Sequence, residues 1–123
     1  MLKVKSIRPL MTMVVTTANK VKSKILKGTG EYDTVQKVLY IGDTVRGIEV
    51  GDLVSINPIR YANFYQDPNS VKANGSIKSF DIPTITINGE KLFKLQQADI
   101  EYVITEYEDK DSNIELLDNT IIN

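Results

Sequence analysis

Acidic side chains crowded near the C-terminus are the residues whose types and spacing come closest to a chemical site. Glu106, Glu108, Asp109 and Asp111 follow one another closely, and paired carboxylates can act as general acid and base or bind calcium. Acid–base catalysis needs two carboxylates in a pocket that drives their pKa values apart, whereas a dense acidic run near a chain end is typical of a solvated surface. The glycine and final glutamate of an EF-hand loop are missing. We therefore predict no catalytic residue and no metal site.

The amino-acid composition excludes most other kinds of enzyme active site. The chain has no Cys, no His and no Trp, which excludes thiol nucleophiles, Ser-His-Asp triads, disulfides and zinc sites built on Cys or His. The glycines of Gly28-Thr29-Gly30 are not followed by the Lys-Ser/Thr pair of a phosphate-binding loop. The sequence thus predicts a protein that is not an enzyme and carries no cofactor.

Length and charge bound the organisation of the chain. Its 123 residues, 41% of them hydrophobic, fit one domain with one core. The net charge is only −1, but residues 1–46 carry nine Lys/Arg against three Asp/Glu, and residues 99–123 carry eight acids against Lys110 alone. We expect the two ends to attract each other, within one chain or between neighbouring subunits. The uncharged run from Pro9 to Asn19 is too short to cross a bilayer, so we expect no membrane association.

Short apolar runs rich in β-branched residues, separated by turn residues, predict an all-β chain. The Asn88-Gly89 pair is a strong hairpin signal, because both central residues of a type I′ turn need positive φ. The expected strands are Leu2 to Val4, Leu10 to Thr17, Thr34 to Ile41, Leu53 to Pro58, Ile82 to Ile87, Glu90 to Leu95 and Tyr102 to Tyr107.

Two long segments interrupt this pattern, a lysine-rich loop at residues 19–33 and an irregular insertion at residues 59–81. Loops of such length are uncommon in compact domains unless they carry function. Between them, Val38-Leu39-Tyr40-Ile41-Gly42 and Val50-Gly51-Asp52-Leu53-Val54 are separated by a turn that contains Gly47. Gly51 supplies backbone freedom and Asp52 can cap the turn, a pattern typical of small barrels with sharp corners.

These pieces resemble, in order, the bacterial co-chaperonin (GroES) family. The matching segments cover most of residues 6–58 and 90–106, and they are Ile7-Arg8-Pro9-Leu10, the two corner segments above and Leu95-Gln96-Gln97-Ala98-Asp99-Ile100. The resemblance implies a small, partly open β-barrel whose first and last strands pair with neighbouring subunits.

On that basis the terminal strands are predicted subunit contacts, with Lys3 and Lys5 on the first strand and Glu101, Glu106 and Glu108 on the last. Pairing between subunits would cover edge strands that otherwise invite aggregation. The alternative is that the same strands pair within one monomer. We expect a homo-oligomer or a part of a larger assembly.

The resemblance also implies that the loop after the second strand ends in a hydrophobic tripeptide, preceded by glycines, that docks on a chaperonin ring. Here the corresponding place reads Ser23-Lys24-Ile25-Leu26-Lys27-Gly28, so the docking element is reduced. Ile25 and Leu26 are candidate partner-binding residues. Alternatively, they pin the loop onto their own barrel or onto a neighbour.

The insertion at residues 59–81 holds an aromatic cluster, and the candidate partner-binding residues there are Arg60, Tyr61, Phe64 and Tyr65. Such aromatics can stack on nucleic-acid bases. However, the sequence pI of about 5.4 gives no net basic domain. Aromatic residues beside Arg are typical of protein interfaces or of local packing. We therefore predict a protein partner.

The last segment, residues 108–123, combines acidic residues with aliphatics such as Ile114 and Leu116, and it is predicted to be an extension that docks on a neighbouring surface. Residues 1–107 would then form the barrel. The early Ile-Arg-Pro-Leu and the late Asp-Ile-Glu-Tyr-Val are also similar to small proteins of crAss-like tailed phages. We expect a non-enzymatic auxiliary (decoration) capsid protein located in the virion. The alternative is a cytoplasmic co-chaperonin that caps a chaperonin ring.

Overall fold

The computed structural model describes residues 2–21, 32–64 and 77–108, without the side chains of residues 77 and 78. All regular elements in this part of the chain are strands or short 3₁₀ turns, which confirms the predicted all-β class. They are β1 (Met13–Thr16), β2 (Val35–Ile41), β3 (Leu53–Ile56), η1 (Pro58–Tyr61), β4 (Ala62–Phe64), β5 (Ile77–Phe80), β6 (Thr84–Ile87), β7 (Glu90–Gln96), η2 (Gln97–Asp99) and β8 (Ile100–Ile104).

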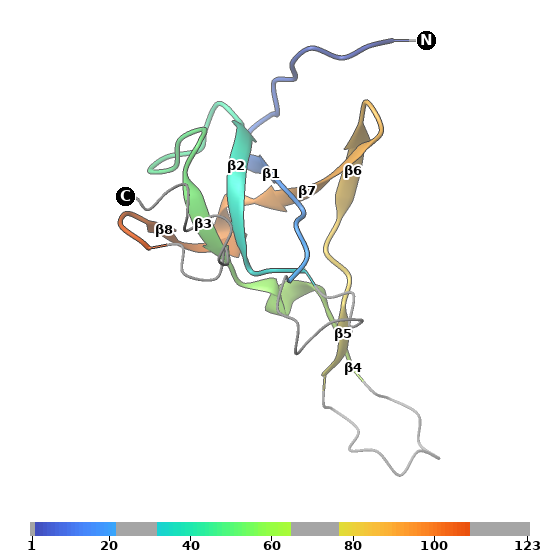
Figure 1. Ribbon diagram of the computed structural model, residues 1–123, viewed down its shortest axis with the longest axis vertical. Helices are drawn as coiled ribbons and strands as arrows, with labels where there is room; N and C mark the ends of the chain where they lie inside the picture. Colours follow the sequence, from blue (N-terminus) through green and yellow to red (C-terminus); the bar gives the residue numbers. More distant parts are fainter. Residues whose placement is uncertain (1, 22–31, 65–76, 109–123) are drawn as a thin grey trace.

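Six strands form one antiparallel sheet in the order β6-β7-β1-β2-β3-β8, and β4 pairs with β5 in a separate two-stranded sheet (Figure 1). The chain runs from β7 through η2 directly into β8, although these strands stand at distant places in the sheet order. The sheet must therefore curl. The η2 corner between β7 and β8 is hydrogen-bonded to segments on both sides of it. Asn57 N–H donates to Asp99 O and Gln97 N–H donates to Thr12 O, each over 2.8 Å. The result is the expected partly open β fold, with β6 and β8 as its edges.

The inner face of the curled sheet holds the hydrophobic core, because side chains alternate between the faces of a strand. One cluster surrounds Val14 and Val54, and the other surrounds Phe93, whose ring meets that of Tyr32 edge-on at 4.9 Å. The buried members are Val14, Val38, Val45, Ile48 and Val54 in the first cluster, and Ile56, Phe93 and Leu95 in the second.

The predicted turns form as expected. Asn88 and Gly89 have φ values of 51° and 82°, the positive angles of the hairpin turn between β6 and β7. Gly51 has φ 98°, and the Asp52 carboxylate accepts a 2.8 Å hydrogen bond from Glu49 N–H, so Asp52 caps this corner. At Gly42 the limit is space, because a Cβ atom there would lie 2.2 Å from the carbonyl oxygen of Met11.

The prediction of a strand at Leu2 to Val4 was wrong, and with it the placement of Lys3 and Lys5 on a strand. Residues 2–10 contain no regular element. The backbone of Val4 pairs with the Asn88 side chain instead of a neighbouring strand, an arrangement that apolar periodicity does not reveal. Strand β1 begins only at Met13 because the preceding turn brings Met13 N–H to Leu10 O, 3.2 Å away.

Two further boundaries differ from expectation. The last strand ends at Ile104, so Glu106 and Glu108 lie beyond it and only Glu101 lies on it. The insertion at residues 59–81 is more regular than predicted, because it contains most of η1 and the whole of β4 and β5. Asn57 starts this structure by accepting Ile59 N–H at 3.0 Å, and Pro58 stands at the first turn, where a missing N–H costs nothing.

Candidate functional site

The insertion hairpin, which we define as residues 58–64 and 77–80, extends from one end of the curled sheet (Figure 1). Its strands pair Ala62 with Phe80 and Phe64 with Ile77. A two-stranded hairpin alone is at best marginally stable in water. It therefore needs an attachment to the six-stranded sheet, and a single buried carboxylate provides one.

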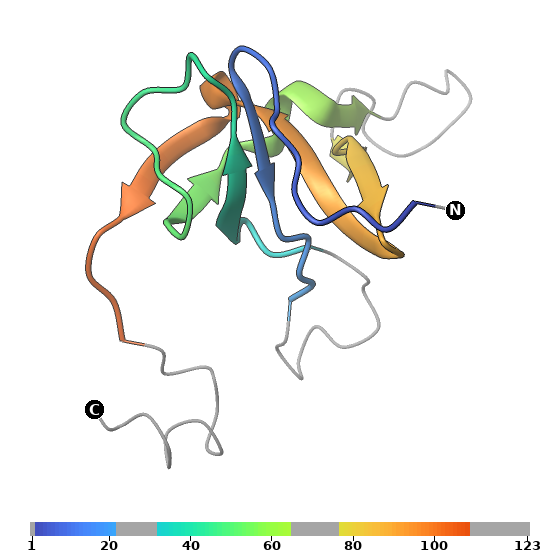
Figure 2. The same ribbon diagram turned by 90° about the horizontal axis from the view of Figure 1, so that it is seen from above.

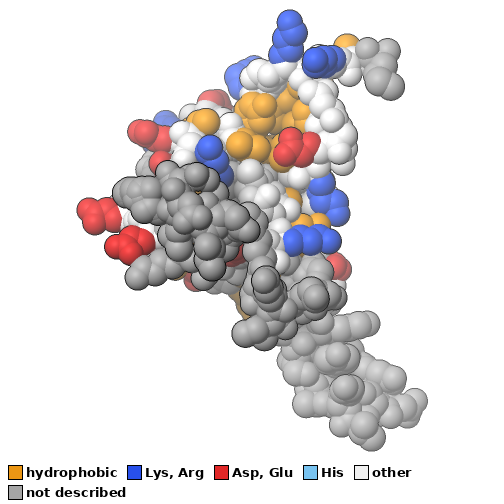
Figure 3. All heavy atoms as spheres, viewed as in Figure 1, with side chains coloured by type: hydrophobic (Ala, Val, Ile, Leu, Met, Phe, Trp, Pro, Cys, Tyr) orange, Lys and Arg blue, Asp and Glu red, His pale blue; other side chains and the backbone are white. Residues whose placement is uncertain are grey.

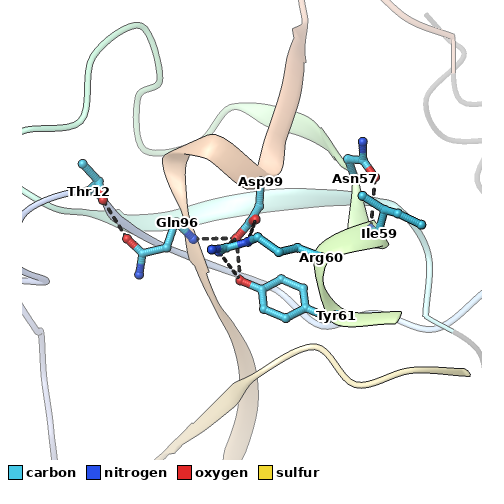
Figure 4. A network of polar contacts seen from close by, with 7 residues as sticks. All are labelled: Thr12, Asn57, Ile59, Arg60, Tyr61, Gln96 and Asp99. Carbon is cyan, nitrogen blue, oxygen red and sulfur yellow. Dashed lines mark hydrogen bonds and ion pairs between the residues drawn. The ribbon is translucent and has the colours of Figure 1, made fainter. Parts of the chain in front are cut away.

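That carboxylate belongs to Asp99 in η2, a residue that is only 3% exposed. Arg60 donates to it through Nε at 2.9 Å and through Nη2 at 3.0 Å, and the Tyr61 hydroxyl donates at 2.6 Å (Figure 4). Gln96 N–H donates a fourth hydrogen bond at 2.9 Å. A buried charge is tolerated when it is paired and fully hydrogen-bonded, and Asp99 meets both conditions.

The ionisation of this cluster follows from its contacts. Burial opposes the charged form of Asp99, but the donors on Arg60, Tyr61 and Gln96 outweigh burial and lower the pKa of the carboxyl below its ordinary value. The hydrogen bond to Asp99 raises the pKa of Arg60. Burial, and then the hydrogen bond to Asp99, raises the pKa of Tyr61. Near neutral pH, Asp99 and Arg60 are thus an ion pair and Tyr61 is a neutral donor.

Arg60 and Tyr61 therefore have a structural role, which is the local packing that the sequence left open beside partner contact. The Tyr61 hydroxyl is directed to Asp99, and the Arg60 side chain holds the same carboxylate while staying 55% exposed. Their role as partner contacts stays a prediction. Asp99 stands three residues after Gln96 and accepts its N–H, as the third residue of a capping box does, but Gln-x-x-Asp is not the usual capping-box sequence.

Apolar side chains are exposed on and beside the insertion hairpin. Phe64 is 39% exposed, Phe80 is 43% exposed and Ile59 is 52% exposed. Phe64 was predicted as a partner contact and is accessible for that role. Phe80 and Ile59 were not singled out, since Phe80 stands apart from the aromatic cluster in the sequence and Ile59, next to Arg60, is aliphatic. Tyr65 lies outside the described residues.

The lysine-rich loop begins and ends at a neck fastened by one buried side chain, that of Gln36 on β2, which is 1% exposed. Its Oε1 accepts from the Thr17 hydroxyl at 2.6 Å and from Asn19 N–H at 2.9 Å. Its Nε2 donates to Asn19 O and to Asp33 O, each at 2.8 Å. All four hydrogen-bonding positions of the amide are used, and the two ends of the loop are held together. Ile25 and Leu26 lie outside the described residues.

Two lysines meet the ring of Tyr32 next to this neck. The ammonium groups of Lys20 and Lys91 each lie 5.8 Å from the ring centroid, and Lys91 Nζ also donates to the Tyr32 hydroxyl at 3.1 Å. Cation–π contacts of this length contribute about 0.5–1 kcal/mol at exposed sites. Because Tyr32 also packs on Phe93, its ring contributes to the hydrophobic core and is not available to stack on a ligand.

The predicted subunit contacts are spread over different sides of the fold. Acidic side chains gather toward β8, and basic side chains gather around the N-terminal end (Figure 3). Among the described residues, no ion pair joins Lys3 or Lys5 to Glu101 or Glu106. Residues 2–10 form no strand and β8 pairs with β3, so within the described residues the two ends of the chain do not pair with each other. Pairing between subunits stays a prediction.

Comparison with known proteins adds no relative. No protein-family model matches the chain, and no curated protein matches it. Within residues 2–21, 32–64 and 77–108, no group of three or more Asp and Glu side chains is arranged to hold a metal ion. The same part of the chain has no helix long and apolar enough to cross a membrane.

Proposed function

We propose that this chain is a non-enzymatic structural protein that attaches to a larger protein assembly through its insertion hairpin. The observation that carries the proposal is the exposure of Ile59, Phe64 and Phe80 on an element that is fastened to the barrel by Asp99. Exposed apolar patches on soluble domains are typical of binding surfaces. Apolar side chains on an element that is already held in place lose little conformational entropy on binding, which favours affinity.

The assembly that we propose is the head of a tailed phage, with the chain as an auxiliary (decoration) protein in the virion. The support is the similarity of Ile7-Arg8-Pro9-Leu10 and of Asp99-Ile100-Glu101-Tyr102-Val103 to small proteins of such phages. The partner would be protein and not nucleic acid, because the net charge of −1 provides no basic surface overall. Copies of the chain would associate with one another through their oppositely charged ends.

A co-chaperonin is the second candidate function. The lysine-rich loop leaves the barrel between β1 and β2, where the co-chaperonin family has its docking loop, and Gln36 holds the two ends of that loop together. In that case Ile25 and Leu26 would contact the chaperonin, and the insertion hairpin would have another role.

Substitution of Phe64 tests the hairpin. Because Phe64 is partly exposed, Phe64→Ala should lower the free energy of unfolding by less than about 1 kcal/mol, but it should weaken attachment by about 2 kcal/mol if the ring fills a partner pocket. Tyr102→Ala is the matched control, since Tyr102 is an exposed aromatic residue on β8. Attachment is measured by co-sedimentation with phage heads, and stability by urea unfolding. Undiminished co-sedimentation of Phe64→Ala would contradict the proposal.

Replacing Ile25 and Leu26 by Asp separates the two functions. A decoration protein should still co-sediment with heads after this change. A co-chaperonin should lose an ATP-dependent complex with a chaperonin that the unmodified chain forms. Detection of such a complex, together with absence of the chain from purified virions, would replace the first proposal by the second.

A further inference from the structure

Strand β6 is an edge of the six-stranded sheet that lacks the protection edge strands usually have. It pairs with β7 on one side, and in Figure 2, as in Figure 1, no other described strand lies along its other side. Its four residues alternate threonine with isoleucine and include no charge, no proline and no register shift. Natural sheets protect their edges with exactly such devices, so the uncovered edge of β6 is suited to pairing with another strand.

The opposite edge of the sheet, β8, is protected. It carries Glu101, which is exposed, and its pairing with β3 has an irregular register between Ser55 and Ile56. A charge and a bulge both oppose the addition of a further strand. The chain therefore guards one edge of its sheet against pairing and leaves the other edge open to it.

The hydrogen-bond pattern shows which backbone groups of β6 face outward. Lys94 N–H donates to Pro83 O at 2.9 Å, so residue 83 bonds toward β7. Because bonded and non-bonded residues alternate along an antiparallel pair, the two isoleucines of β6 also bond toward β7. The N–H and C=O groups of Thr84 and Thr86 therefore point away from the sheet. Both threonines are exposed, and no hydrogen bond in the described part of the chain uses these outward groups.

These outward groups match those of a second copy of the same strand. When two β6 strands lie antiparallel about a twofold axis at Ile85, Thr84 of each copy exchanges both backbone hydrogen bonds with Thr86 of the other. Ile85 then faces Ile85 of the second copy as a non-hydrogen-bonded pair, the kind whose side chains are closest. Threonine facing threonine is also a pairing that stabilises sheets. Pro83 does not interfere, because the N–H that it lacks would point toward β7 and not toward the second copy.

Charge and symmetry favour β6 of a second copy as the occupant of this edge. Like charges directly opposite each other destabilise a sheet, and β6 has none to bring against itself, whereas β8 of a neighbour would place Glu101 beside an uncharged strand. Pairing of β6 with β6 also closes after two molecules, but pairing of β6 with β8 would leave further edges free. We propose that β6 is a dimerisation edge, at which two copies join their sheets antiparallel about Ile85. This inference goes beyond the proposed function, since it holds whichever assembly the chain joins.

Disulfide formation tests the register, and the absence of Cys from the sequence makes an introduced thiol unique. Ile85→Cys places the two thiols opposite each other, with Cα atoms about 4.5 Å apart, a separation that a disulfide spans. Ile87→Cys is the matched control on the same face of the same strand, but its two copies would lie roughly 14 Å apart along the pair, too far for a disulfide. On mild oxidation, Ile85→Cys should give several-fold more covalent dimer than Ile87→Cys. Equal yields from the two variants would overturn the proposal.

Proline substitution tests the hydrogen bonds of the dimer without a thiol. Thr86→Pro removes an outward N–H and leaves the bonds between β6 and β7 in place, since proline is tolerated where the N–H of an edge strand faces solvent. By symmetry both copies lose a donor, so sedimentation equilibrium should show the dissociation constant of the dimer rising roughly tenfold or more, with an unchanged circular dichroism spectrum. Thr105→Pro, at an exposed position after β8, should leave the dimer intact. A parent protein that sediments as a monomer, or a Thr86→Pro variant that dimerises as tightly as the parent, contradicts the proposal.

Discussion

Removal of the Asp99 carboxylate is the sharpest perturbation of the attachment between the insertion hairpin and the barrel. Asp99→Ala takes away the acceptor of the Tyr61 hydroxyl, of Gln96 N–H and of two Arg60 nitrogens. Asp99→Asn is the conservative partner of this variant. It keeps one oxygen for Tyr61 and Gln96, but it turns an amide donor toward Arg60.

The size of the effect follows from what is left without a partner. A buried donor that loses its acceptor costs about 1–3 kcal/mol, and Asp99→Ala leaves two partly buried donors without their acceptor, the Tyr61 hydroxyl and Gln96 N–H. The Arg60 head group adds little, because its side chain is 55% exposed and water replaces the lost bonds. We expect Asp99→Ala to lower the free energy of unfolding by about 3 kcal/mol, and Asp99→Asn by less than half of that. Typical domains are stable by only about 5–15 kcal/mol.

Urea unfolding followed by circular dichroism measures this difference, since the chain has no Trp. Tyr61→Phe is the matched control. It removes one hydrogen bond to Asp99 but leaves the carboxylate paired with Arg60, so it should cost about 1 kcal/mol. A loss below about 0.5 kcal/mol for Asp99→Ala would refute the view that this carboxylate holds the hairpin.

The same ion pair gives stability a defined dependence on pH. The pKa of Asp99 is lowered in the folded protein, so its contribution is present above the unfolded value near 3.9 and is lost as the pH falls through the folded value. The parent protein should therefore lose stability below about pH 4, and the gap between it and Asp99→Asn should narrow there. A gap that stays constant through this range would show that ionisation of Asp99 contributes nothing.

Three further outcomes are expected. Gln36→Leu should lower the free energy of unfolding in urea by about 2–4 kcal/mol and speed hydrogen exchange at the loop neck, because buried groups lose their partners. Gly42→Ala should lower the free energy of unfolding at least as much in the same assay, since its Cβ would lie 2.2 Å from Met11 O. Gly47→Ala, which has open space around it but a φ of 80°, should cost about 1 kcal/mol. In alkaline absorbance titration, Tyr61 should ionise above the ordinary pKa near 10, and stability should fall as the pH rises through that raised value.

Features decided by neighbours in the sequence were predictable. The Asn88-Gly89 turn and the corner at Gly51 depend on backbone angles that few residues tolerate, so residue type alone indicates them. The strand predicted at Glu90 to Leu95, on the far side of the Asn88-Gly89 turn, is also present as β7 (Glu90–Gln96). These elements fix the all-β class and most of the sheet.

Features decided by distant side chains were not predictable. Val4 was assigned to a strand because it is apolar and β-branched, but its backbone is paired by the side chain of Asn88. The insertion at residues 59–81 is predicted to be irregular from its turn residues, whereas β4 and β5 pair there over three residues of β4. Arg60, at the base of these strands, binds Asp99, which lies 39 residues later in the chain. Periodicity describes the burial of single residues and does not record such pairings.

Two buried side chains, Gln36 and Asp99, show how the fold accommodates two long segments whose composition differs from that of the sheet. Gln36 and Asp99 are both buried and satisfied by several hydrogen bonds, and each fastens the base of one long segment to a strand or corner of the barrel. A buried polar group gives its full stabilisation only when every partner is in place, so each base has one defined geometry. Phe64, farther along the insertion hairpin than Tyr61, is 39% exposed and belongs to neither core cluster, so it is accessible for partner contacts. Arg60 can therefore bind the buried carboxylate of Asp99 while exposed Phe64, in the same hairpin, is accessible to a partner.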